Sequence, residues 1–172
     1  MAWETLKLSE RDNALYGKLY MSRYDIGKAR SCAWQISKKK WHSFPIFRRG
    51  SVPTYQIALT TTLIVAYARP FIPGRGKGFA FPERLKQYGP EEEILHRMIL
   101  KLRNEQYAHT DPASYEIKPY DDPYFMSIDM VPESHFSSEE IDLFLTMTEG
   151  LQSRINDRME EIHASARTRH RP

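Results

Sequence analysis

The side chains best suited to chemistry lie within one short stretch, at Arg103, Asn104 and His109. Histidine exchanges a proton near neutral pH, because its unperturbed pKa is about 6.5. Arginine is always cationic, and its planar set of donors matches the oxygens of a phosphate group. The amide of asparagine can orient either neighbour. Together these residue types predict phosphodiester chemistry: a base for a ribose 2′-hydroxyl, a cation for the charge that develops on phosphorus, and an orienting amide.

The spacing of these residues requires either a break in the helix or a second chain. Six residues of α-helix advance about 9 Å and turn through about 600°, so Arg103 and His109 would lie roughly 120° apart. The chain continues with Thr110-Asp111-Pro112, and the residue before a proline is pushed out of the α region. We therefore expect the helix to end or distort within this stretch, or two copies of it to converge from two chains.

The stretch resembles the motif of the HEPN family (higher eukaryotes and prokaryotes nucleotide-binding). Leu102-Arg103-Asn104, followed by Ala108-His109-Thr110-Asp111, is most similar to the abortive-infection and toxin-like branch of that family. A weaker echo is the helical segment that ends in Ala66-Tyr67-Ala68-Arg69-Pro70-Phe71. The resemblance covers chiefly residues 53–112.

The resemblance implies an all-α, HEPN-like four-helix bundle that acts as a metal-independent endoribonuclease on RNA. His109 would be the general acid or base at the 2′-hydroxyl, Arg103 would stabilise the phosphorane-like transition state, and Asn104 would orient them. Two protomers would bring their motifs into one cleft, so we expect a homodimer. The branch also implies a toxin or phage-defence role, with an antitoxin protein as a candidate partner. No cofactor and no metal ion is expected, since no HxxxH, CxxC or carboxylate cluster accompanies the motif.

Two other interpretations of the motif stay open. Cations near the C-terminus of a helix stabilise its macrodipole by about 0.3–1 kcal/mol, so Arg103 and His109 could simply cap a helix in an interaction protein. A HEPN-like bundle could also bind a nucleotide or a protein partner without cutting RNA.

Four segments with apolar residues at helical spacing are predicted to position the motif. They are residues 1–40, in one or two pieces, residues 54–69, the segment from residue 90 to the motif, and a long helix that begins with a capping box at residues 137–140. In the third segment, Ile94, Met98 and Leu102, together with Ile99, are predicted to face the core, and His96 lies one face away. Residues 115–130, rich in Tyr, Pro and Asp, are expected to form a short extended excursion before the last helix.

Three further cations are candidates for RNA or phosphate contacts. Arg69 ends the second helical segment, and Arg75 and Lys77 lie on a glycine-rich backbone within the long connection of residues 71–89. A Walker motif would need Ser or Thr after the lysine, and Gly78 stands there instead, so an NTPase loop is excluded.

The first segment carries two features with more than one interpretation. Tyr16, Tyr20 and Tyr24 recur every four residues, which predicts half-buried packing or, alternatively, base stacking. The densest basic patch, residues 37–42 with Lys38, Lys39 and Lys40, could be a solvated helix end or an RNA backbone contact.

Composition indicates a globular protein without a membrane segment. We expect one domain over residues 1–166 and a basic disordered tail at residues 167–172 of the 172-residue chain. The net charge is only +3, so nucleic-acid binding would have to come from a local patch. The single cysteine, Cys32, cannot form an intramolecular disulfide, and no signal peptide is recognisable, so a cytoplasmic location is expected. The apolar run at residues 57–68 is far shorter than the roughly 20 residues of a membrane-spanning helix.

Overall fold

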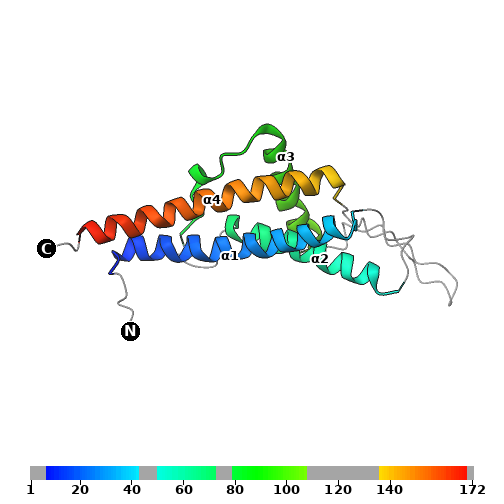
Figure 1. The fold of residues 1–172 in the computed structure, drawn as a ribbon, viewed down its shortest axis with the longest axis horizontal. Coiled ribbons are helices and arrows are strands. Elements are labelled where there is room, and N and C mark those ends of the chain that lie inside the picture. Colours follow the sequence, from blue (N-terminus) through cyan, green and yellow to red (C-terminus); the bar gives the residue numbers. More distant parts are fainter. Residues whose placement is uncertain (1–6, 43–49, 73–78, 108–135, 170–172) are drawn as a thin grey trace.

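The computed structural model describes residues 7–42, 50–72, 79–107 and 136–169 (Figure 1). All regular structure within these ranges is helical, which confirms the prediction of an all-α protein. The α-helices are α1 (Glu10–Lys38), α2 (Val52–Ala68), α3 (Pro90–Leu102) and α4 (Ser138–Arg169). Two short 3-10 helices, η2 (Arg69–Phe71) and η3 (Glu83–Leu85), and one π-helical turn, η4 (Arg103–Tyr107), accompany them.

The two longest helices, α1 and α4, lie side by side along the long axis of the molecule (Figure 1). The second helix, α2, packs against α1, and the shorter α3 crosses α4 at a steep angle (Figure 1). The four predicted helices are therefore present, and α1 is one continuous helix rather than two pieces. The last helix continues to Arg169, three residues past the boundary predicted at residue 166. The predicted extended excursion at residues 115–130 lies outside the described residues.

Hydrogen bonds at the helix starts explain why the helices begin where they do. The predicted capping box is confirmed: the Ser137 N–H donates to Glu140 Oε2 at 2.8 Å, and the Glu140 N–H donates to Ser137 Oγ at 3.1 Å. Pro90 occupies the first turn of α3, and the Gly89 N–H donates to Glu92 Oε2 at 2.8 Å. The Asp12 N–H donates to Ser9 Oγ in the same way at the start of α1.

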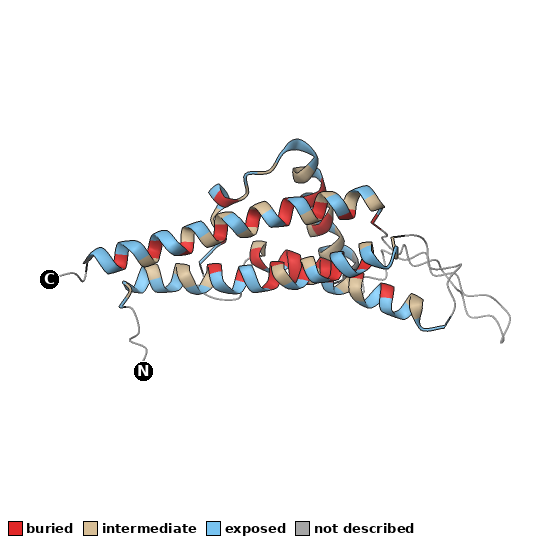
Figure 2. Ribbon diagram, viewed as in Figure 1, coloured by how far each residue is buried: buried red, intermediate tan, exposed pale blue. Residues whose placement is uncertain are grey.

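Among the described residues, the buried apolar side chains form two clusters, and Figure 2 shows the buried positions in red. The first joins the C-terminal half of α1 with α2, α3 and the start of α4, and includes Tyr67, Ile99 and Phe144. The second joins the N-terminal half of α1 with the C-terminal half of α4, and the connection between η2 and α3 contributes Phe81 and Leu85 to it.

The register of α3 differs from the one that the sequence predicted. Ile94 is 69% exposed, whereas Leu95, His96 and Ile99 are buried. The predictions that Ile94 faces the core and that His96 lies off the core face were therefore wrong. The other predicted positions hold, because Ile99 is buried and Met98 and Leu102 pack against the first apolar cluster. A change of one residue turns a helix face by about 100°, and it brings His96 against Tyr67 of α2.

Candidate functional site

The predicted motif begins where α3 changes from α-helical to π-helical geometry. The last α-helical residue is Leu102, and the π-helical turn runs from Arg103 to Tyr107. At the junction the Arg103 N–H donates to two carbonyl oxygens, those of Ile99 and Leu100. Segments of π-helix are rare and often occur at functional sites. The prediction that the helix ends or distorts within the motif is confirmed.

The π-helical turn holds the first two motif residues together. Arg103 Nη1 donates to Asn104 Oδ1 at 3.0 Å. Arg103 is half-buried and Asn104 is exposed, while the preceding residue, Leu102, packs against the first apolar cluster. A guanidinium has five N–H donors, and no carboxylate of the described residues forms an ion pair with Arg103. The arrangement leaves this cation suited to bind an anionic group near the surface.

The other predicted site residues are not gathered here by the described part of the chain. Arg69 Nη1 lies 3.4 Å from Asp25 Oδ1 of α1, and the two form an ion pair. The Asp25 side chain is only 13% exposed and that of Arg69 is 57% exposed, so the pair ties the end of α2 to α1 at the edge of the core. His109, Arg75 and Lys77 lie outside the described residues.

Sequence reasoning missed a buried polar cluster made by Tyr67, Tyr88 and His96. The Tyr67 hydroxyl lies 2.8 Å from His96 Nδ1 and 3.1 Å from the Tyr88 hydroxyl. Phe71 packs edge-on against the His96 ring, with ring centroids 4.7 Å apart. The cluster joins α2, α3 and the connection between them. The sequence did contain a signal for it: Leu95, Ile99 and Leu102 also recur at helical spacing, and a core face built on them would have placed His96 beside the core.

The environment of this cluster keeps its groups neutral. Burial, assisted by the nearby Lys86 ammonium, lowers the pKa of His96 to about 4. Burial raises the pKa of Tyr88 to about 12 and raises the pKa of Tyr67 well above its ordinary value. A neutral imidazole can accept the Tyr67 O–H at Nδ1, and the Tyr67 oxygen can in turn accept from Tyr88. These groups fix helices relative to one another and do not resemble a catalytic acid–base pair.

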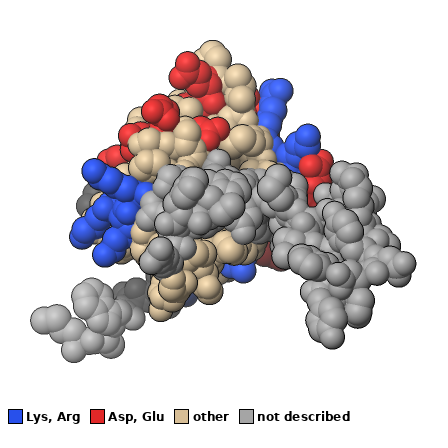
Figure 3. All heavy atoms as spheres, turned by 90° about the vertical axis from the view of Figure 1, so that its right-hand side faces the viewer, with Lys and Arg blue, Asp and Glu red and all other residues tan. Residues whose placement is uncertain are grey.

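Charge is separated on the surface at one end of the bundle. In the end-on view of Figure 3, acidic side chains gather at the top and basic side chains at both sides.

Comparison with protein-family models, with curated proteins and with solved structures gives no match for this chain. Within the described ranges, none of the helices is both long and apolar enough to cross a lipid bilayer. The same ranges contain no group of three or more His, Cys, Asp or Glu side chains placed to hold a metal ion.

Proposed function

We propose that this protein is a metal-independent endoribonuclease of HEPN type, with Arg103, Asn104 and His109 as its catalytic residues. The single observation that carries the proposal is the Arg103–Asn104 hydrogen bond on a π-helical turn. An orienting amide beside a cation is what the motif requires at that point. The turn interrupts α3 at the first motif residue, as expected if the motif needs a geometry that a regular helix does not give.

The proposed reaction is a transesterification within the RNA strand. The ribose 2′-oxygen forms a bond to the adjacent phosphorus while the bond from phosphorus to the 5′-oxygen breaks. His109 takes the proton of the 2′-hydroxyl, the departing 5′-oxygen takes up a proton, and Arg103 binds the phosphate oxygens as negative charge accumulates on them. The products are a 2′,3′-cyclic phosphate and a 5′-hydroxyl. Two protomers would supply the two copies of the motif, so the active form is proposed to be a homodimer.

A second candidate function is a HEPN-like module that binds a nucleotide or a protein partner without cutting RNA. The pairing of Arg69 with Asp25 favours it, because an arginine engaged by a carboxylate of its own chain is a weaker second phosphate contact. In either case the family branch suggests a toxin or phage-defence role, with an antitoxin protein as partner.

Incubation of the purified protein with a single-stranded RNA in EDTA tests the proposed reaction. We expect cleavage products that end in 2′,3′-cyclic phosphate, and we expect His109→Ala to lower the rate by about 10²–10⁴, the usual effect of removing a positioned proton-transfer group. Arg103→Ala should be similarly impaired. A suitable control is Arg97→Ala, since Arg97 is an exposed α3 arginine that pairs with Glu93, and it should retain full activity.

Two results would overturn the mechanism. An all-deoxy oligonucleotide lacks the nucleophile, so its cleavage would exclude a 2′-hydroxyl reaction. Full activity of the His109→Ala protein would remove the proposed base. Light scattering of the same preparation should give twice the chain mass of 20.2 kDa, and a persistent monomer would exclude a site shared between two protomers.

A further inference from the structure

The outward face of α1 carries a row of paired aromatic and cationic side chains. Arg23 Cζ lies 5.6 Å from the ring centroid of Tyr20, Lys28 Nζ 4.4 Å from that of Tyr24, and Lys38 Nζ 4.5 Å from that of Trp34. All six side chains are exposed. We call this set the α1 stripe: Tyr20, Arg23, Tyr24, Lys28, Trp34 and Lys38.

Helix geometry places the α1 stripe on one side of α1. At about 100° per residue its members fall within a sector of about 140°, and Tyr20 to Lys38 spans about 27 Å along the axis. The remaining member of the tyrosine series, Tyr16, behaves differently, because it is half-buried and stacks on His163 with ring centroids 4.9 Å apart. Packing therefore accounts for Tyr16 and leaves Tyr20 and Tyr24 without a role in the core.

The charge of this face is strongly one-sided. Over residues 15–38 of α1 the sequence has five Lys or Arg residues and one acidic residue, Asp25, and that carboxylate is buried against Arg69. Within the described residues no carboxylate pairs with Arg23, Lys28 or Lys38. Three of these five cations, Arg23, Lys28 and Lys38, belong to the α1 stripe, so the stripe presents positive charge to the solvent.

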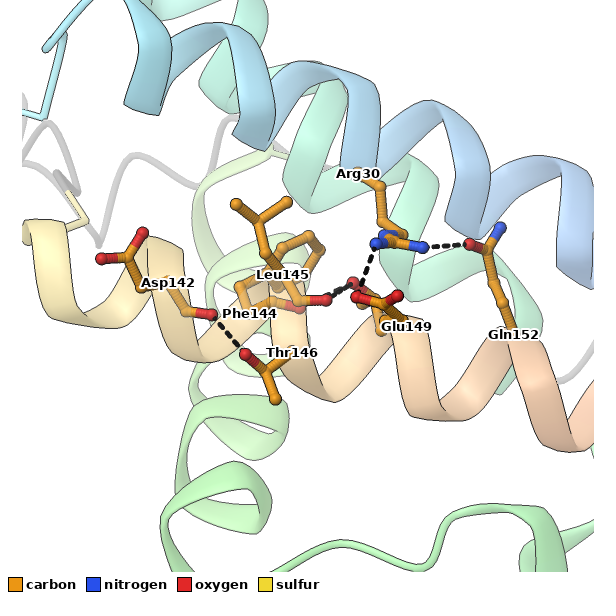
Figure 4. Close-up of polar contacts among 8 residues, drawn as sticks. Arg30, Asp142, Phe144, Leu145, Thr146, Glu149 and Gln152 are labelled. Atoms are coloured by element: carbon orange, nitrogen blue, oxygen red, sulfur yellow. Dashed lines mark hydrogen bonds and ion pairs between the residues drawn. The ribbon is translucent and has the colours of Figure 1, made fainter.

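A shallow hollow runs beside the α1 stripe, along the seam between α1 and α4. Gly27, Ser31 and Gln152 line both of its adjoining parts. Beside the hollow, Arg30 links α1 to α4: it donates to Gln152 Oε1 at 2.8 Å and pairs with Glu149 Oε2 at 3.3 Å (Figure 4). Arg30 is thus neutralised by its own chain. The hollow offers uncharged hydrogen-bonding groups next to the exposed rings and cations.

We propose that the α1 stripe is the docking surface for single-stranded RNA. Exposed aromatic rings stack on unpaired bases, neighbouring cations contact the phosphate backbone, and both interactions tolerate any sequence. The proposal rests on RNA as the substrate of the proposed function and adds where the strand lies on the protein. Duplex RNA presents no unstacked bases, so the surface should select single strands.

Fluorescence anisotropy with a labelled 12-nucleotide RNA tests this surface. Every ribose of the probe carries a 2′-O-methyl group, so the probe cannot be cut and binding is measured apart from cleavage. Replacing Tyr24 or Trp34 by Ala should weaken binding by about 5-fold to 100-fold each, the usual loss for one stacked base. Tyr55→Ala, which removes an exposed tyrosine of α2 outside the stripe, should leave the affinity unchanged.

Salt dependence examines the cations separately. For single strands, the logarithm of the binding constant falls with the logarithm of the salt concentration by about 0.7 for each neutralised phosphate. The combined variant Arg23→Gln, Lys28→Gln and Lys38→Gln should therefore lower this slope by about 2. Because these six side chains are exposed, the variants should melt like the parent, and circular dichroism checks this. Arg97→Gln on α3 is the matched control.

Three outcomes would overturn the docking surface. The first is an unchanged affinity in both sets of stripe variants, and the second is equal binding of a duplex of the same length. The third is conversion of a dimer into monomers by the stripe variants, which would assign this face to a second copy of the chain. Failure of cleavage is a separate result, because the His109→Ala protein should bind the methylated probe with full affinity.

Discussion

The α1 stripe and the buried cluster of Tyr67, Tyr88 and His96 combine aromatic rings with basic side chains, but they differ in exposure to water. In the stripe, cations stay charged beside exposed rings. In the cluster, the basic group is an imidazole whose pKa burial lowers to about 4. Desolvation disfavours the charged form, so the stripe presents positive charges to an anion, whereas the imidazole of the cluster is neutral near pH 7. Residue type alone would not have separated these two roles.

The largest expected difference between the two regions is in stability. Tyr67 is fully buried and touches Phe71, Phe144 and His96, so Tyr67→Ala should lower the free energy of unfolding by about 3–5 kcal/mol. Tyr24→Ala in the stripe should change it by less than about 0.5 kcal/mol. Urea denaturation measures both. Similar losses in the two variants would mean that the stripe is also part of the packed structure.

The second difference is a dependence of stability on pH. The folded pKa of His96 is about 4 and its ordinary value is 6.5. Between these values the unfolded chain binds more protons than the folded one, so the free energy of unfolding should fall as the pH is lowered from about 6.5 to 4. The full change from this one group is about 3 kcal/mol. Denaturation curves of the parent and of His96→Gln should diverge over that window, and parallel curves would contradict the effect.

The smallest of the three effects concerns a single hydroxyl. Tyr67→Phe keeps the ring but leaves His96 Nδ1 and the Tyr88 hydroxyl without their shared partner, which should cost about 1–3 kcal/mol. Tyr20→Phe in the stripe is the matched change and should be close to neutral. Thermal melting of the two variants distinguishes them, and equal melting temperatures would show that the buried hydroxyl contributes nothing.

Local patterns in the sequence predicted the starts of α3 and α4, whereas the first helix was predicted from residue 1 and begins at Glu10. The capping box at Ser137 and the proline-led start of α3 depend on residues within one turn. The spacing of Arg103 and His109 predicted a break in the helix between them, but not that it would begin at Arg103 as a π-helical turn. The burial of His96 in place of Ile94 did not follow, because the apolar spacing of Ile94, Met98 and Leu102 favours Ile94. Contact with Tyr67 of another helix selects between them.

Contacts between residues far apart in the chain could not be predicted from local sequence patterns either. The partner of Arg69 is Asp25, 44 residues earlier in the chain, and no spacing rule connects them. The Arg103–Asn104 contact joins neighbours in sequence, but it depends on the π-helical turn that directs the two side chains. The placement of His109, Arg75 and Lys77 belongs to the part of the chain that the structure does not describe.

The two apolar clusters differ in how many helices enclose them. In the described part of the chain, the second cluster lies between α1 and α4 around Leu19 and Ile155, and Phe81 and Leu85 of the connection complete it together with Phe71 and Tyr88. Arg154 fastens this cover, since its Nε donates to the Leu85 carbonyl oxygen at 2.8 Å. A release of a few residues of the connection would expose that cluster while α2 and α3 stayed packed at the other end. Local opening of the second cluster therefore needs less free energy than global unfolding. Amide hydrogens should exchange first in the N-terminal half of α1 and the C-terminal half of α4.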